Sequence, residues 1–238
     1  MDTVLICLIL FFASFVQAAS GFGYAITAMA FLPLLLPLTD AMMVTIICSF
    51  LIMLYMYIKY RKHVNYKIAW LPLLLSLVGA YAGMALLINS PSDIALKILG
   101  GFLILLSIYF FVFAQRIKLP NNRISASVAG LLSGLTGGFF NMGGPPVVLY
   151  YSVAAKDKNE YYATLQFLFI CMSLLKFGYF AITLGISEEV LKVSPFGIAT
   201  SIAGMVLGMF VFNKLPDKII NRMVYVIMIV SGIWYIIK

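Results

Sequence analysis

The feature that most constrains this chain is a series of long apolar segments that are separated only by short polar stretches. Most of them have 17–24 residues, and a helix of about 20 residues is long enough to cross a hydrocarbon core of about 30 Å. The apolar runs are continuous, whereas the strands of a membrane β-barrel alternate apolar and polar residues. We therefore predict an all-α, polytopic membrane helix bundle. The segments cover residues 3–19, 24–37, 41–58, 68–88, 94–114, 124–140, 147–155, 161–184, 193–212 and 219–237.

The small number of charged residues excludes several classes of protein. Of the 238 residues, 63% are hydrophobic and only 10% are charged, whereas about 25% of the residues of a soluble domain are charged. The chain therefore has too few charges to cover a water-facing surface, which excludes a water-soluble enzyme, a disordered chain and a disulfide-rich secreted domain. The net charge of +8 still requires an explanation, and a nucleic acid is one partner to consider.

The positions of the basic residues explain this charge by membrane topology. If the loop at residues 59–67 faces the cytoplasm, 12 of the 16 Lys and Arg residues lie on that side and 3 lie outside, as the positive-inside rule requires. The remaining one, Lys176, lies inside an apolar segment. This orientation places both termini outside, and it leaves no basic patch for a nucleic acid.

The spacing of glycine and proline landmarks predicts an internal repeat. The matching landmarks are Gly21 and Gly143, Gly79-x-x-x-Gly83 and Gly204-x-x-x-Gly208, and Pro91 and Pro216, at spacings of 122, 125 and 125 residues. The whole chain, residues 1–238, is then one transmembrane domain with repeats at residues 1–120 and 121–238. Each repeat holds five segments, an odd number, so the second repeat starts on the opposite side of the membrane and the two have inverted topology.

A glycine-rich break opens each repeat and precedes a short apolar segment. The breaks lie at Ser20–Gly23 and at Asn141–Pro146. Unwound backbone in hydrocarbon is costly and persists where it lines a cavity or binds a ligand. Each break makes a hairpin that is either re-entrant or fully spanning, and a new helix N-terminus there has free N–H groups that favour anions. The alternative is that the glycines only permit tight helix packing.

These breaks and the polar residues of the apolar zone define the candidate substrate-binding site. Lys176 is the one charged side chain that lies far from the ends of its apolar segment, where such residues are candidates for function. Its ammonium either provides a counter-charge for an anion or extends to the lipid headgroups. The candidate residues are Gln17, Ser20, Gly21, Phe22, Gly23, Asn141, Met142, Gly143, Gly144, Pro145, Pro146, Gln166 and Lys176.

Other motifs indicate packing rather than chemistry. The pairs Gly79-x-x-x-Gly83, Gly204-x-x-x-Gly208 and Gly130-x-x-x-Gly134-x-x-x-Gly138 are typical of helix-contact faces. The three cysteines lie in apolar runs without the spacing of a metal site. We find no nucleotide-binding, protease or hydrolase motif in the sequence, so we expect neither enzyme activity nor a metal or cofactor.

The two glycine-rich segments resemble the signatures of a known family. The first is Ala19-Ser20-Gly21-Phe22-Gly23, followed by apolar residues and Pro33, and the second runs from Gly130 through Gly137-Gly138 to Asn141-Met142-Gly143-Gly144-Pro145-Pro146. Both are similar to the sulfite exporter TauE/SafE family of bacterial membrane proteins, over essentially the whole chain. Members are inner-membrane permeases linked to export or uptake of sulfite, sulfonates and related sulfur-containing anions. The resemblance therefore implies the inner membrane as the location and such an anion as the substrate.

The residues and the resemblance together predict a secondary transporter for a small anion that works by alternating access. An anion channel that uses the same glycine-rich tips is one alternative, and a membrane scaffold without transport is another. The expected partners are the anionic substrate and the lipid bilayer, with H⁺ or Na⁺ as a coupling ion to be considered. No segment holds a central Asp or Glu that identifies a proton-coupling site.

Overall fold

The computed structural model describes residues 2–20, 23–113, 119–212 and 217–237. These residues form helices and connecting loops, without a strand, which confirms the predicted all-α class. Three short helical turns, η1 Leu32–Leu34, η2 Arg61–His63 and η3 Tyr109–Phe113, supplement the main helices. The main helices are α1 Asp2–Ser20, α2 Tyr24–Phe31, α3 Leu38–Tyr60, α4 Tyr66–Ile88, α5 Ser92–Ile108, α6 Arg123–Phe140, α7 Gly144–Ala154, α8 Lys158–Thr183, α9 Glu188–Phe212 and α10 Asp217–Ile237.

Every predicted apolar segment corresponds to one of these helices, and polar caps explain where several of them begin. The Asn65 side chain accepts hydrogen bonds from the first N–H groups of α4. Asn122 does the same for α6 and Asp157 for α8. A cap satisfies N–H groups that have no partner within the helix, so these helices begin one to three residues before their apolar segments.

Five helices in the described part of the chain are long and apolar enough to cross a membrane. They span Leu38–His63, Tyr66–Ile88, Ser92–Phe111, Lys158–Thr183 and Glu188–Phe210. The apolar stretches of α1, of α2 with η1, and of the described end of α10 are shorter, at Thr3–Ala18, Tyr24–Leu34 and Met228–Ile237. In the described part of the chain, fewer helices are therefore long and apolar enough to cross a membrane than the sequence has long apolar segments.

The chain forms two compact units, and each one combines helices from the two halves of the sequence. Unit 1 consists of Met1–Ser49, Ser90–Arg116 and Ile186–Lys238, and unit 2 consists of Phe50–Asn89 and Ile117–Gly185. Helix α3 contributes its first part to unit 1 and its last part to unit 2.

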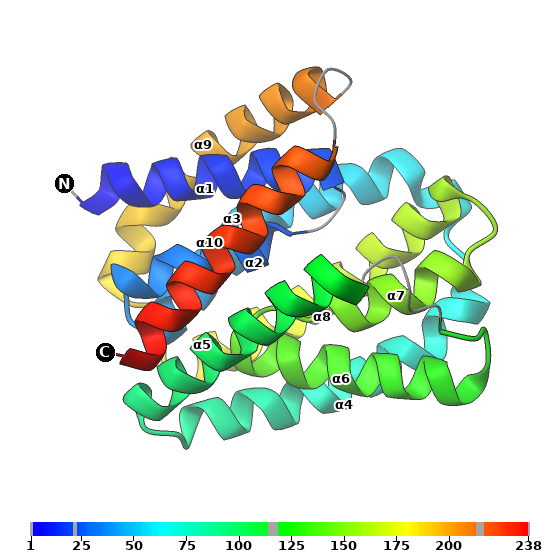
Figure 1. Ribbon diagram of the computed structural model, residues 1–238, viewed down its shortest axis with the longest axis horizontal. Coiled ribbons are helices and arrows are strands. Elements are labelled where there is room, and N and C mark those ends of the chain that lie inside the picture. Colours follow the sequence, from blue (N-terminus) through cyan, green and yellow to red (C-terminus); the bar gives the residue numbers. More distant parts are fainter. Residues whose placement is uncertain (1, 21–22, 114–118, 213–216, 238) are drawn as a thin grey trace. The chain divides into compact units, whose positions relative to one another are not determined.

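Within unit 1, α9 packs along α1, and α10 packs along α5 (Figure 1). The glycine pair of α9 lies against the backbone of α1. A Cβ atom added to Gly208 would lie 2.9 Å from the carbonyl oxygen of Phe15, and one added to Gly204 would overlap the carbonyl oxygen of Phe11. Glycine is required at both positions because the two backbones approach too closely for a side chain.

Within unit 2, the closest pair of helices is α4 and α6 (Figure 1). A Cβ atom on Gly79 would lie 2.6 Å from the carbonyl oxygen of Leu131, and one on Gly83 would lie 2.5 Å from that of Leu135. On the partner helix α6, a Cβ atom added to Gly138 would overlap the carbonyl oxygen of Ala80 in α4. The predicted role of these glycine motifs as helix-contact faces is thus confirmed.

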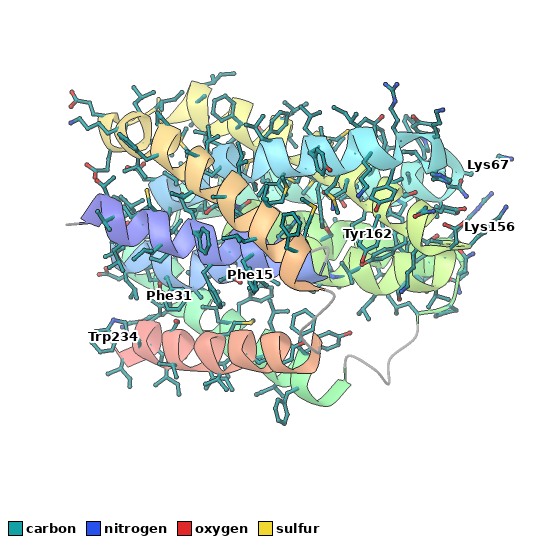
Figure 2. The ribbon with its side chains drawn as sticks, turned by 90° about the horizontal axis from the view of Figure 1, so that it is seen from above. Phe15, Phe31, Lys67, Lys156, Tyr162 and Trp234 are labelled. Carbon is teal, nitrogen blue, oxygen red and sulfur yellow. The ribbon has the colours of Figure 1, made fainter. Side chains whose placement is uncertain are left out.

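One end of unit 2 gathers basic residues from separate loops. The Asn65 side-chain nitrogen donates to a Glu160 carboxylate oxygen at 2.7 Å, which joins the loop before α4 to the start of α8. Figure 2 shows Lys67 and Lys156 at this same end. The loops at residues 59–67 and 156–160, which the sequence assigns to one side of the membrane, therefore lie together.

We expect Gly138→Ala to destabilise the protein by about 1–3 kcal/mol, the usual cost of overpacking. The added methyl group would meet the backbone of Ala80, which cannot move aside as a flexible side chain can. Thermal unfolding of the purified protein in detergent measures this effect. Gly178→Ala is the matched control, because a Cβ atom there meets nothing within 4 Å. Equal melting temperatures for the two variants would contradict the packing role.

Candidate functional site

The break between α6 and α7 is held by a specific backbone conformation at Asn141. Helix α6 ends at Phe140, and Asn141 follows with φ 62° and ψ 15°, in the left-handed region. The N–H of Met142 then donates back to the carbonyl oxygen of Thr136 at 3.2 Å. Asparagine tolerates this conformation better than other side chains with a Cβ atom. The residue therefore ends one helix and turns the chain toward the next.

The two glycines that follow Asn141 have different surroundings. A Cβ atom on Gly143 would lie 2.5 Å from the carbonyl oxygen of Ser133 in α6, and the Ser133 hydroxyl donates to the carbonyl oxygen of Gly143. A Cβ atom on Gly144 would meet only Phe169, at 3.6 Å, which is ordinary contact. Close packing thus explains glycine at position 143, but it does not explain glycine at position 144.

The side chain of Lys176 reaches this break from α8. It is only 6% exposed, and its ammonium donates a hydrogen bond to the side-chain oxygen of Asn141. Among the described residues, this oxygen is the single hydrogen-bond acceptor of the ammonium. The ammonium is therefore turned to the break and covered by protein.

Unit 2 has no carboxylate that could neutralise Lys176. Its two acidic residues are Asp157 and Glu160, and both lie at the start of α8. Glu160 is 16 residues before Lys176, a distance of about 24 Å along a helix. A buried charge without a partner is costly, so an anionic ligand at this position would supply what unit 2 lacks.

The N-terminus of α7 is a weaker anion site than the sequence suggests. A helix normally has four free N–H groups in its first turn, but Pro145 and Pro146 occupy two of these positions and have no N–H. Gly143 and Gly144 are the residues whose N–H groups can still donate. The ammonium of Lys176 is therefore the main positive group at this break.

The first break lies in unit 1 and is built from neutral groups. Gly21 and Phe22, two of the predicted site residues, lie outside the described residues, as does the side chain of Ser20. Gly23 has φ 109°, a conformation that favours glycine. The side-chain oxygen of Gln17 accepts a hydrogen bond from the N–H of Tyr24 at 3.0 Å. Gln17 thus bridges the break and satisfies the first N–H of α2.

The structure adds one polar contact that the sequence analysis did not identify. The hydroxyl oxygens of Tyr24 and Ser201 lie 2.7 Å apart, and both residues are buried. Ser201 precedes the glycine pair of α9 by three residues, as Ser76 precedes that of α4. Ser76 also makes an interhelical contact, because its hydroxyl donates to the carbonyl oxygen of Gly130 at 2.9 Å. The shared Ser-x-x-Gly-x-x-x-Gly pattern is the signal that could have indicated Ser201.

The other predicted residues of unit 2 have separate positions. Met142 and Pro145 are buried in the packing around the break, and Pro146 is half-buried. Gln166 is fully buried in α8, but it lies ten residues before Lys176, about 15 Å away along the helix. The structure therefore brings Asn141 and Lys176 together, whereas Gln166 lies at a different level of α8.

The surface of the described helices has the apolar character of a lipid-facing one. Large apolar side chains are highly exposed on several helices, including Ile124, Ile182, Phe210 and Trp234, the last of which is labelled in Figure 2. Water does not stabilise so much exposed apolar surface on a monomer. Together with the five long apolar helices, this surface defines a multi-pass membrane protein.

Comparison with protein families identifies the family to which this membrane protein belongs. Residues 6–235 match the family described as sulfite exporter TauE/SafE, so the chain belongs to this family of membrane transport proteins. Comparisons with curated proteins and with solved structures find no significant match. The family consists of transporters rather than enzymes. In the described part of the chain, no three His, Cys, Asp or Glu residues lie together as metal ligands would.

Two substitutions at Asn141 separate its backbone role from its side-chain role. Asn141→Ala places a Cβ-bearing residue without a polar side chain in the left-handed region, which costs about 1–2 kcal/mol, whereas Asn141→Gly accepts the conformation. Both remove the acceptor of the Lys176 ammonium. We therefore expect the glycine variant to melt at a higher temperature than the alanine variant. Thermal unfolding in detergent tests this, and the reverse order would refute the assigned backbone conformation.

Proposed function

We propose that this protein is a secondary transporter that carries a small anion, such as sulfite, an organosulfonate or a related sulfur-containing anion, across the bacterial inner membrane. Membership of the TauE/SafE family supports transport of this kind. The observation that carries the proposal is the buried Lys176 ammonium at the Asn141 break, without a carboxylate partner in unit 2. Such a site is complete only when an anion is bound.

The interrupted helix supports a binding role for the break. The backbone between Phe140 and Gly144 is not helical, although it lies in an apolar part of a membrane protein. Interrupted helices at membrane depth are tolerated where the backbone is covered by protein or lines a cavity, and in transporters they hold the substrate. Gly144, whose missing side chain is not explained by packing, is the position where a ligand can approach the backbone closely.

Matching helix pairs support the internal repeat. The α9 glycines lie against Phe11 and Phe15 of α1, and the α4 glycines lie against Leu131 and Leu135 of α6. In both cases the partner positions differ by 120 residues. We propose that residues 1–120 and 121–238 are repeats whose fourth helix packs on the first helix of the other repeat.

The mechanism that we propose is alternating access between inverted repeats, in which the substrate site faces one side of the membrane at a time. The basic end of unit 2 supports a cytoplasmic position for the loops at residues 59–67 and 156–160. Both termini are then outside.

Flux into proteoliposomes tests the function directly. We expect labelled sulfite or methanesulfonate to exchange across the membrane, with stimulation by unlabelled anion on the opposite side. A channel would show flux without this stimulation. If folded protein moves neither anion, the proposed function is wrong.

Gly144→Leu tests whether the ligand approaches the break. A leucine side chain would occupy the position at which we propose that the ligand approaches Gly144, so we expect flux to fall at least about tenfold while the protein remains folded. Gly101→Leu in α5 is the matched control, because a Cβ atom added to Gly101 meets nothing within 4 Å. Flux and thermal unfolding are measured for both variants. Unchanged flux in folded Gly144→Leu would exclude this position from the site.

A further inference from the structure

The charge at the Asn141 break amounts to a single buried ammonium. Among the lysine and arginine side chains whose burial the structure describes, Lys176 is the one that is buried. The acidic residues of unit 2 lie at the far end of α8, so they do not offset its charge locally. The prolines of α7 remove two of the N–H groups that could add to the positive potential. The net charge available to a ligand is therefore close to that of one cation.

The number of unpaired N–H donors on the Lys176 ammonium also suits a sulfonate group. A lysine ammonium has three N–H donors, and Asn141 accepts one of them. The described residues provide no acceptor for the other two. A sulfonate group, with three oxygens around one sulfur atom, can accept both of these hydrogen bonds while its methyl or alkyl end stays in apolar surroundings.

We infer that the site selects singly charged anions, such as an alkanesulfonate or hydrogen sulfite, over doubly charged anions such as sulfate. This inference rests on the proposed function and specifies its substrate class. A monoanion forms a neutral pair with Lys176, which the apolar surroundings tolerate. A dianion leaves one negative charge without a partner in the same surroundings, where an isolated charge is strongly disfavoured.

The test compares anions of similar shape and different charge. Methanesulfonate is compared with sulfate, and isethionate with sulfoacetate, by calorimetric titration of the purified full-length protein and by flux into proteoliposomes. We expect each monoanion to bind at least about tenfold more tightly than its doubly charged counterpart. Equal or tighter binding of the dianions overturns the inference and leaves the proposed function intact. Binding and flux of none of the four anions overturns both.

Variants of Lys176 connect the selectivity to the ammonium. Lys176→Arg keeps the positive charge, so the preference for monoanions should remain. Lys176→Met removes the charge with little change in length, so binding of the monoanions should weaken and the preference should disappear. Lys158→Met is the matched control, because Lys158 is an exposed lysine at the start of the same helix. If Lys176 only stabilises Asn141, folded Lys176→Met retains the wild-type preference, and the inference is wrong.

Discussion

The structure depends on one requirement of the membrane environment, that every backbone polar group finds a partner within the protein. A helix meets this requirement because its N–H and carbonyl groups pair with one another. The break after α6 meets it through a few specific contacts. Met142 donates to Thr136, and Ser133 donates to Gly143. These contacts leave Asn141 free to present its side chain to Lys176. The break is thus held in one conformation, and this conformation would keep the groups of the proposed ligand site in place.

Close packing of glycine faces supports this order. In unit 2, Gly134 and Gly138 bring the backbone of α6 against that of α4. The end of α6 is therefore held by backbone contacts that cannot repack as long side chains do. Because Asn141 directly follows this rigid segment, its position relative to α8 is well defined. In the proposed mechanism of alternating access, such elements would keep the geometry of the site while other parts of the protein move.

The two breaks differ in charge, although they occupy similar positions in the sequence. In unit 1, Gln17 caps Tyr24 and the tyrosine hydroxyl meets Ser201, so neutral groups satisfy one another. In unit 2, an amide oxygen meets a buried ammonium. If the two halves are repeats, as we propose, the cation belongs to only one of the two breaks. In the proposed transporter, charge recognition belongs to unit 2.

The sequence by itself determined the helical class, the positions of the ten apolar segments and the locations of both breaks, because hydrophobic length and glycine or proline placement are local properties. It also indicated the glycine contact faces. Only the tertiary structure decided which side chains meet. Asn141 and Lys176 are 35 residues apart and Tyr24 and Ser201 are 177 apart, and no local pattern encodes such pairings.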